Sequence, residues 1–197
     1  GGTGKALRVF SKAAHGGGLL GYWNIRSEDG KVEDEVTISD VLQVVAKDST
    51  PSSEVALFSQ KSKEIRIVNA AAAGGSLTPK LPVELGAFEF DLVTVAPILS
   101  IAGVKVALLG LIDKYNTLAG LTSSGRAADG ALEVDVKSTG ELALWLGEYK
   151  EGSPPRVTVD GEEVKATAER CRIGSLLTVP LEVGGKPEGS FAVRIAL

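Results

Sequence analysis

Two short segments near the N-terminus contain residue types that can do chemistry. His15-Gly16-Gly17-Gly18 matches the oxyanion loop of some α/β-hydrolases, and Gly1-Gly2-Thr3-Gly4-Lys5 is similar to a phosphate-binding loop. The first chemistry also needs a Gly-x-Ser-x-Gly turn and a histidine base, but the chain has one histidine and no such turn. The second needs Ser or Thr after the lysine, where this chain has Ala6. We therefore interpret residues 15–18 as a hairpin loop and residues 1–5 as a linker.

Metal binding and thiol chemistry find little support in the composition. One His and one Cys, Cys171, cannot supply a His/Cys zinc site. The acidic segment 26–35 contains Asp29, Glu33 and Asp34, but their spacing fits no calcium loop, so we interpret the segment as a solvated loop. Cys171 has no visible partner base and is typical of a packed small residue. The sequence predicts no metal site and no cofactor.

Paired carboxylates are the remaining catalytic possibility. Glycoside hydrolysis needs two acids that face each other across a cleft, with one kept protonated by an apolar site. The acids of this chain lie mostly on turns or on the polar phase of predicted strands, and no pair stands out. We assign no catalytic residue within 1–197 and expect no activity from this chain alone.

Trp145 is the candidate interface residue. It lies out of phase with Leu142, Leu144 and Leu146, so it points to the other face of its predicted strand. An exposed Trp there would anchor an interface or stack on a sugar ring, whereas the alternative is cover by a loop or another domain. The docking hypothesis predicts an exposed apolar patch around Trp145. Tyr22 and Trp23 lie in an apolar strand and are interpreted as core.

The elements that must position these residues are strands, because the dominant period of the sequence is two. Apolar residues alternate with polar ones in several segments, so each segment presents one apolar face to a core. Such stripes occur at 88–92, 104–108, 132–136, 142–146, 177–183 and 191–197. Their spacing, with turn residues between them, predicts an all-β, two-sheet antiparallel β-sandwich.

Turns and helices complete the predicted architecture. Asp160-Gly161 suits a two-residue type I′ turn in a hairpin over 157–164. Helical signal is thin: Ser39-Asp40 is a candidate cap for a short turn over 41–46, and 111–115 predicts another. The alanine run 70–73 precedes two glycines and is interpreted as a loop. We expect 1–197 to form one domain.

Composition bounds the partners and the compartment. The chain has 197 residues, 21 basic and 25 acidic, hence a net charge of −4, and 44% hydrophobic residues. These values are typical of a globular protein and argue against a nucleic-acid or membrane partner. A single cysteine, the absence of a glycosylation sequon and no visible signal peptide favour the cytoplasm. Because position 1 is not Met, we expect that the chain was cut from something longer.

Several segments, taken in order, carry a resemblance to a known family. They resemble the C-terminal part of the raffinose synthase, alkaline α-galactosidase and seed imbibition protein family, which is related to glycoside hydrolase family 36. The matching segments are Ala6–Phe10, Gly18–Asn24, Ser39–Val41, Phe88–Pro97, Ala107–Asn116 and Val157–Val164. The chain departs from the family pattern at Leu108, where the family has Pro.

The resemblance implies a function for a longer parent protein. In such proteins a (β/α)₈ barrel precedes this region and carries the catalytic aspartates, and the parent acts on α-galactosides by hydrolysis or galactosyl transfer. The present chain then is a non-catalytic accessory domain whose partner is that upstream barrel. The alternative is a carbohydrate-binding module for galactosides, which needs two or more aromatics in line together with polar groups.

Overall fold

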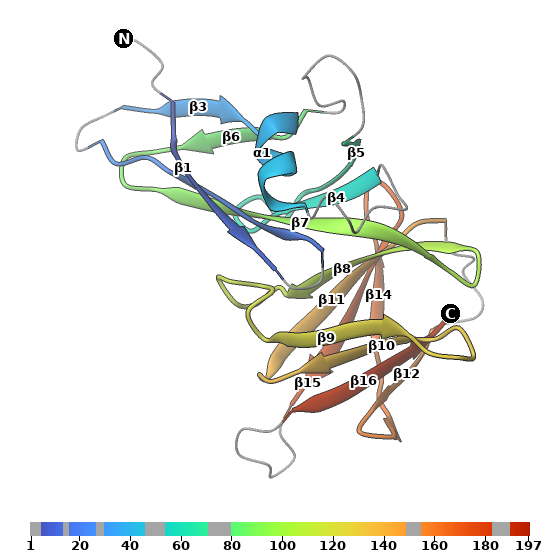
Figure 1. Ribbon diagram of the computed structural model, residues 1–197. Coiled ribbons are helices and arrows are strands. Elements are labelled where there is room, and N and C mark those ends of the chain that lie inside the picture. Colours follow the sequence, from blue (N-terminus) through green and yellow to red (C-terminus); the bar gives the residue numbers. More distant parts are fainter. Residues whose placement is uncertain are drawn as a thin grey trace. The chain divides into compact units, whose positions relative to one another are not determined.

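The structure is a computed structural model that describes residues 5–13, 16–26, 30–45, 54–70, 80–148, 155–182 and 190–197 (Figure 1). Their regular structure is almost entirely antiparallel strand, arranged in sheets. This confirms the predicted all-β antiparallel sandwich. Among the described residues, no helix has the length and apolarity needed to cross a membrane.

Packing divides the chain into two compact units, Gly1–Pro97 and Ile98–Leu197, called here the N-terminal and C-terminal units. Strand β7 (Phe90–Ile101) belongs to both, because it begins in the first and ends in the second. Sequence patterning did not anticipate this division. The assignment of 1–197 to a single accessory domain stays a prediction, and the predicted linker lies outside the described residues except for Lys5.

The N-terminal unit has a main sheet with its strands in the order β1-β2-β7-β4-β5. A second layer consists of one helix and a two-stranded sheet, and Figure 1 shows both on the same side of the main sheet. The new elements are β1 (Leu7–Lys12), β2 (Gly18–Trp23), β4 (Glu54–Ser59), β5 (Ile65–Asn69), β3 (Val32–Glu35), β6 (Pro82–Leu85) and α1 (Ile38–Val44). The core between the layers is built from aliphatic side chains such as Leu20, Val41 and Val93.

The C-terminal unit contains two sheets of antiparallel strands. One has the order β8-β11-β15-β14, and the other has the order β13-β12-β16-β10-β9. Their bounds are β8 (Val104–Leu111), β9 (Leu121–Arg126), β10 (Leu132–Val136), β11 (Gly140–Leu146), β12 (Arg156–Val159), β13 (Glu162–Glu163), β14 (Thr167–Arg170), β15 (Ser175–Leu181) and β16 (Phe191–Ala196). Alternate residues of β10 and β16 are buried, as the period of two predicts.

The hairpin between β12 and β13 has the predicted turn. Val159 pairs with Glu162, and the two residues between them, Asp160 and Gly161, have φ values of 52° and 86°. Two positive φ angles define the type I′ turn, whose twist matches that of the flanking strands.

The helix begins earlier than predicted. Thr37, not Ser39 or Asp40, is its N-cap, and Asp40 lies at the third helical position. The Thr37 hydroxyl accepts a hydrogen bond from the Asp40 amide, while the Asp40 carboxylate accepts one from the Thr37 amide, which makes a capping box. The backbone amides of Thr37 and Asp40 therefore both have hydrogen-bond partners at the start of α1, where Asp40 is buried.

The apolar stripe at 88–92 was expected to face the core, and this is wrong for its first two apolar residues, which lie in the turn before β7 and at the start of β7. Phe88 and Phe90 are 68% and 39% exposed, whereas Asp91 is buried. Asp91 accepts hydrogen bonds from the Ser59 hydroxyl at 2.7 Å and the Lys61 amide at 3.0 Å. These donors offset the desolvation of the carboxylate, so the polar phase of the strand can lie inside.

Candidate functional site

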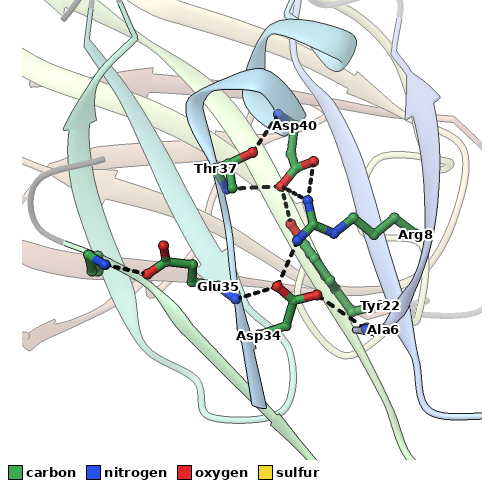
Figure 2. A network of polar contacts seen from close by, with 8 residues as sticks. Ala6, Arg8, Tyr22, Asp34, Glu35, Thr37 and Asp40 are labelled. Atoms are coloured by element: carbon green, nitrogen blue, oxygen red, sulfur yellow. Dashed lines mark hydrogen bonds and ion pairs between the residues drawn. The ribbon is translucent and has the colours of Figure 1, made fainter. Parts of the chain in front are cut away.

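A buried polar network of three charged side chains lies in the N-terminal unit. Figure 2 shows two aspartates from different elements converging on one arginine. Arg8 lies on β1, Asp34 on β3 and Asp40 on α1. The side chains of Asp34 and Asp40 retain 7% and 5% exposure, and Arg8 retains 22%. The network therefore joins an edge strand to both elements of the second layer.

The guanidinium group of Arg8 binds two carboxylates at once, one through each terminal nitrogen. Its Nη1 donates to both oxygens of Asp40 at 2.9 Å, and its Nη2 donates to Asp34 Oδ1 at 2.7 Å. Burial acts to lower the pKa of Arg8, but the hydrogen bond to Asp34 and the charges of Asp40 and Asp34 outweigh it and raise that pKa. Arg8 thus stays cationic, which compensates the burial of the carboxylates.

Asp34 also holds the backbone around it. Its Oδ1 accepts from the Glu35 amide at 2.9 Å, and its Oδ2 accepts from the Ala6 amide at 3.2 Å. Ala6 directly precedes β1. The Asp34 carboxylate therefore binds this strand twice, through the Arg8 side chain and through the main-chain amide of Ala6. The sequence analysis interpreted Asp34 as part of a solvated loop, and that interpretation is wrong: Val32–Glu35 is strand β3 and the Asp34 carboxylate is buried.

Tyr22 completes the network from β2. Its hydroxyl donates to Asp40 Oδ2 at 3.1 Å, and the Arg8 guanidinium lies 5.6 Å from its ring centre. Burial raises the pKa of the Tyr22 phenol well above its ordinary value, and the adjacent Asp40 charge raises it further. A phenol held neutral in this way is a hydrogen-bond donor and not a base.

The donors around the two carboxylates decide what the network can do. Asp40 Oδ2 accepts from Thr37, Tyr22 and Arg8, so its lone pairs are committed to protein donors. A glycosidase acid would instead need a carboxyl group kept protonated by an apolar site. The network fits a structural role: it fastens β1, β2, β3 and α1 together.

A second polar group braces the turn between β6 and β7. The buried Asn24 amide donates to the carbonyls of Gly30 at 2.6 Å and Gly86 at 2.8 Å. Glu89 Oε2 accepts from the Gly86 amide at 2.7 Å and forms an ion pair with Lys61. Hydrogen bonds from Lys61 and from the Gly86 amide lower the pKa of Glu89, which keeps it charged. The turn 86–89 is therefore held from two sides.

Two aromatic rings lie beside this turn on the outer face of the main sheet. Trp23 pairs with Phe90 in register, and their rings are stacked with centroids 6.3 Å apart and planes inclined by 22°. Trp23 was expected in the core together with Tyr22. Tyr22 is fully buried, but Trp23 is only partly buried and lies on the opposite face of β2.

A comparison with known families decides the affiliation of the chain. The family model described as "Raffinose synthase or seed imbibition protein Sip1" matches residues 25–177. The chain belongs to this family. A curated relative, "Probable galactinol--sucrose galactosyltransferase 5" of Arabidopsis thaliana, is 32% identical over 143 residues, which cover 72% of the chain and 16% of the relative. The chain thus spans less than a fifth of the relative's length.

In this member of the raffinose synthase family, the motifs that carried the resemblance supply the polar groups just described. Gly18–Asn24 contributes Tyr22 and Asn24, and Ser39–Val41 contributes Asp40. Arg8 was not predicted from the sequence to belong to any site. One local signal was readable: Thr37-x-x-Asp40 has the spacing of a capping box. The pairing of Asp40 with Arg8 has no local signal.

Trp145, the predicted interface residue, is not exposed. Its side chain is 3% exposed, and its indole N–H donates to the Ile173 carbonyl at 2.6 Å. The segment after β14 therefore covers it within the C-terminal unit, as in the alternative interpretation. The prediction of an exposed apolar patch around Trp145 is wrong, because the strand β11 is buried on both faces.

The remaining residues considered for catalysis or metal binding form no site within the described residues. His15 and Asp29 lie outside the described residues. Cys171 is partly buried; burial, with a further contribution from the charge of Glu169, raises the pKa of its thiol and so lowers the fraction present as the reactive thiolate. Within the described ranges, no three His, Cys, Asp or Glu side chains gather in a way that would hold a metal ion.

Proposed function

We propose that this chain is the non-catalytic C-terminal β-sandwich part of a raffinose-synthase-like α-galactosidase or galactosyltransferase. It packs on an upstream (β/α)₈ catalytic barrel of the same polypeptide and stabilises it. The observation that carries the proposal is the family match over 25–177 in a chain that corresponds to 16% of a galactosyltransferase-like relative. The commitment of Arg8, Asp34 and Asp40 to one another supports a scaffold role.

The test compares three polypeptides: the longer protein, the longer protein without this chain, and this chain alone. Each is assayed for galactosyl transfer from galactinol to sucrose and for hydrolysis of α-galactosides. We expect activity only from the longer protein, with a lower melting temperature when this chain is removed. Turnover by the 197-residue chain alone would overturn the proposal, as would a deletion that leaves both activity and melting temperature unchanged.

A galactoside-binding module is the second candidate, and the stacked pair Trp23 and Phe90 favours it. Aromatic faces attract the C–H groups of a pyranose ring, and two neighbouring rings extend that surface. Titration with galactose, raffinose and α-galactan oligomers should then change Trp fluorescence, and Trp23→Ala should abolish the change. A flat response across millimolar sugar would exclude this candidate.

We also propose a cytoplasmic location, on the basis of the single cysteine of the chain. A fluorescent fusion of the longer protein tests it. Signal from the secretory pathway or an organelle would contradict it.

A further inference from the structure

We propose that the outer face of β1, β2 and β7 is the surface by which this chain docks on the rest of its own longer polypeptide. We call this surface the apolar face. It consists of Leu7, Val9, Trp23 and Phe90 on the strands, of Ile25 just after β2 and of Phe88 in the turn before β7. The inference rests on the proposed function, since it names the surface through which the accessory part would contact the barrel. It lies entirely in the N-terminal unit.

Register places the core of this surface on one side of the sheet. Leu7 pairs with Trp23, and Trp23 pairs with Phe90, so the three side chains form a row across three strands. Val9 lies in the next row, opposite Gly21. Arg8 and Tyr22 alternate with these residues and point to the other face, where they meet Asp40. The apolar face is therefore separate from the buried network.

The side chains of this surface are exposed far beyond what is usual for their types. Leu7 is 51% exposed, Val9 48%, Ile25 70% and Phe88 68%. Single exposed apolar residues are normal, but adjacent ones on neighbouring strands mark an interaction site. The edge position of β1 adds to this, because an uncovered apolar edge strand otherwise favours aggregation.

The surface is also preorganised. Gly21 leaves room for the Trp23 indole to lie flat on the sheet, since a Cβ at Gly21 would come within 2.0 Å of two indole carbons. Phe88 has a φ of 58°, a conformation that bulky residues avoid. The braces from Asn24 and Glu89 hold the turn that contains it. A rigid, exposed aromatic side chain is a typical anchor of a protein interface.

The rest of the same polypeptide is the occupant that best fits these observations. The matched relative has most of its length outside the region that corresponds to this chain. A polypeptide that precedes residue 5 joins the chain at β1, which itself carries Leu7 and Val9, so the effective concentration of such a partner at this surface is high. The aliphatic members suit an apolar protein surface, whereas a sugar needs polar groups beside the rings.

Cysteine labelling in the longer polypeptide tests the surface directly. In a background in which Cys171 and every other cysteine of the longer polypeptide are replaced by Ser, one cysteine is introduced at Leu7 or Phe88, and in matched controls at Leu42 or Tyr115, which are 54% and 76% exposed outside the apolar face. Maleimide labelling rates of the folded protein are divided by those of the same variant in urea. We expect the normalised rate at Leu7 and Phe88 to be about tenfold below that at the controls, because a covered thiol reacts slowly.

The possible outcomes separate the two proposals. Fast labelling at Leu7 and Phe88 with slow labelling at Leu42 or Tyr115 would overturn the inference and keep the accessory role, since docking would then use another face. Fast labelling at all four positions would also overturn the inference, and the activity and melting-temperature comparison under the proposed function would then decide the accessory role by itself. Protection of Leu7 and Phe88 only when raffinose is added would overturn the inference in favour of a sugar site.

Discussion

The Nη1 nitrogen of Arg8 lies 2.9 Å from each carboxylate oxygen of Asp40, although 32 residues separate the two in sequence. This pair links the edge strand β1 to the helix α1 across the layers of the N-terminal unit. Removal of the guanidinium would leave two buried carboxylates without their shared cation, which is costlier than losing an exposed pair. The pair therefore makes a direct prediction about stability.

Arg8→Ala is expected to lower the free energy of unfolding of the chain by about 2–4 kcal/mol at pH 7. The loss stays below that of a fully buried pair because Arg8 keeps 22% of its side-chain exposure. Urea unfolding followed by circular dichroism measures it. The matched control is Arg156→Ala, whose partner Glu163 is 64% exposed, and there we expect less than about 0.5 kcal/mol. Equal losses in both variants would contradict the buried-pair interpretation.

Tyr22→Phe is expected to cost about 1 kcal/mol at pH 7, because Asp40 loses one of its donors. The loss should shrink at alkaline pH. The folded chain raises the pKa of Tyr22 above its ordinary value of 10.0, so this phenol contributes stability below pH 10 that is lost as pH rises further. The Tyr22→Phe variant has no phenol at this position and therefore lacks this alkaline decrease in stability. The free energies of unfolding of both proteins at pH 8 and pH 11 test this prediction. Parallel pH profiles of wild type and variant would contradict it.

Local sequence signals predicted where the strands lie, but they predicted less well which residues of each strand face the core. Alternation marked β10 and β16, and Asp160-Gly161 marked a type I′ turn, because both depend on neighbours along the chain. The start of β7 shows the limit. Its alternation was predicted correctly but the face that lies inside was not, because Ser59 and Lys61, 32 and 30 residues away, supply the donors for a buried Asp91.

The site depended even more on contacts between distant segments. Trp145 was expected to need an outside partner, yet its indole N–H donates a hydrogen bond to the carbonyl of Ile173, which lies 28 residues later in the same chain. Arg8 was not singled out from the sequence, since no local pattern connects it to Asp34 and Asp40. Tertiary pairing decided which alternate residues face inward, and the sequence alone does not contain that pairing in readable form.

Gly21→Ala should disturb the apolar face without touching the buried network. The new methyl group would meet Cη2 and Cζ3 of Trp23 at 2.0 Å, so the indole must move. We expect a loss of about 1–3 kcal/mol and faster acrylamide quenching of Trp23 fluorescence. Gly125→Ala on β9 is the control, since a Cβ there meets no atom within 4 Å, and its stability should change by less than about 0.5 kcal/mol. Unchanged quenching in Gly21→Ala would contradict the flat packing of Trp23.

The two tryptophans of the chain should report opposite environments. In Trp23→Phe the remaining Trp145 should emit at short wavelength and resist acrylamide, because it is 3% exposed. In Trp145→Phe the remaining Trp23 should be quenched readily. That second variant should also lose about 1–2 kcal/mol, since the Ile173 carbonyl loses its indole donor. If Trp145 proved the more accessible of the two, its cover by the segment after β14 would be wrong and the original docking hypothesis would regain its basis.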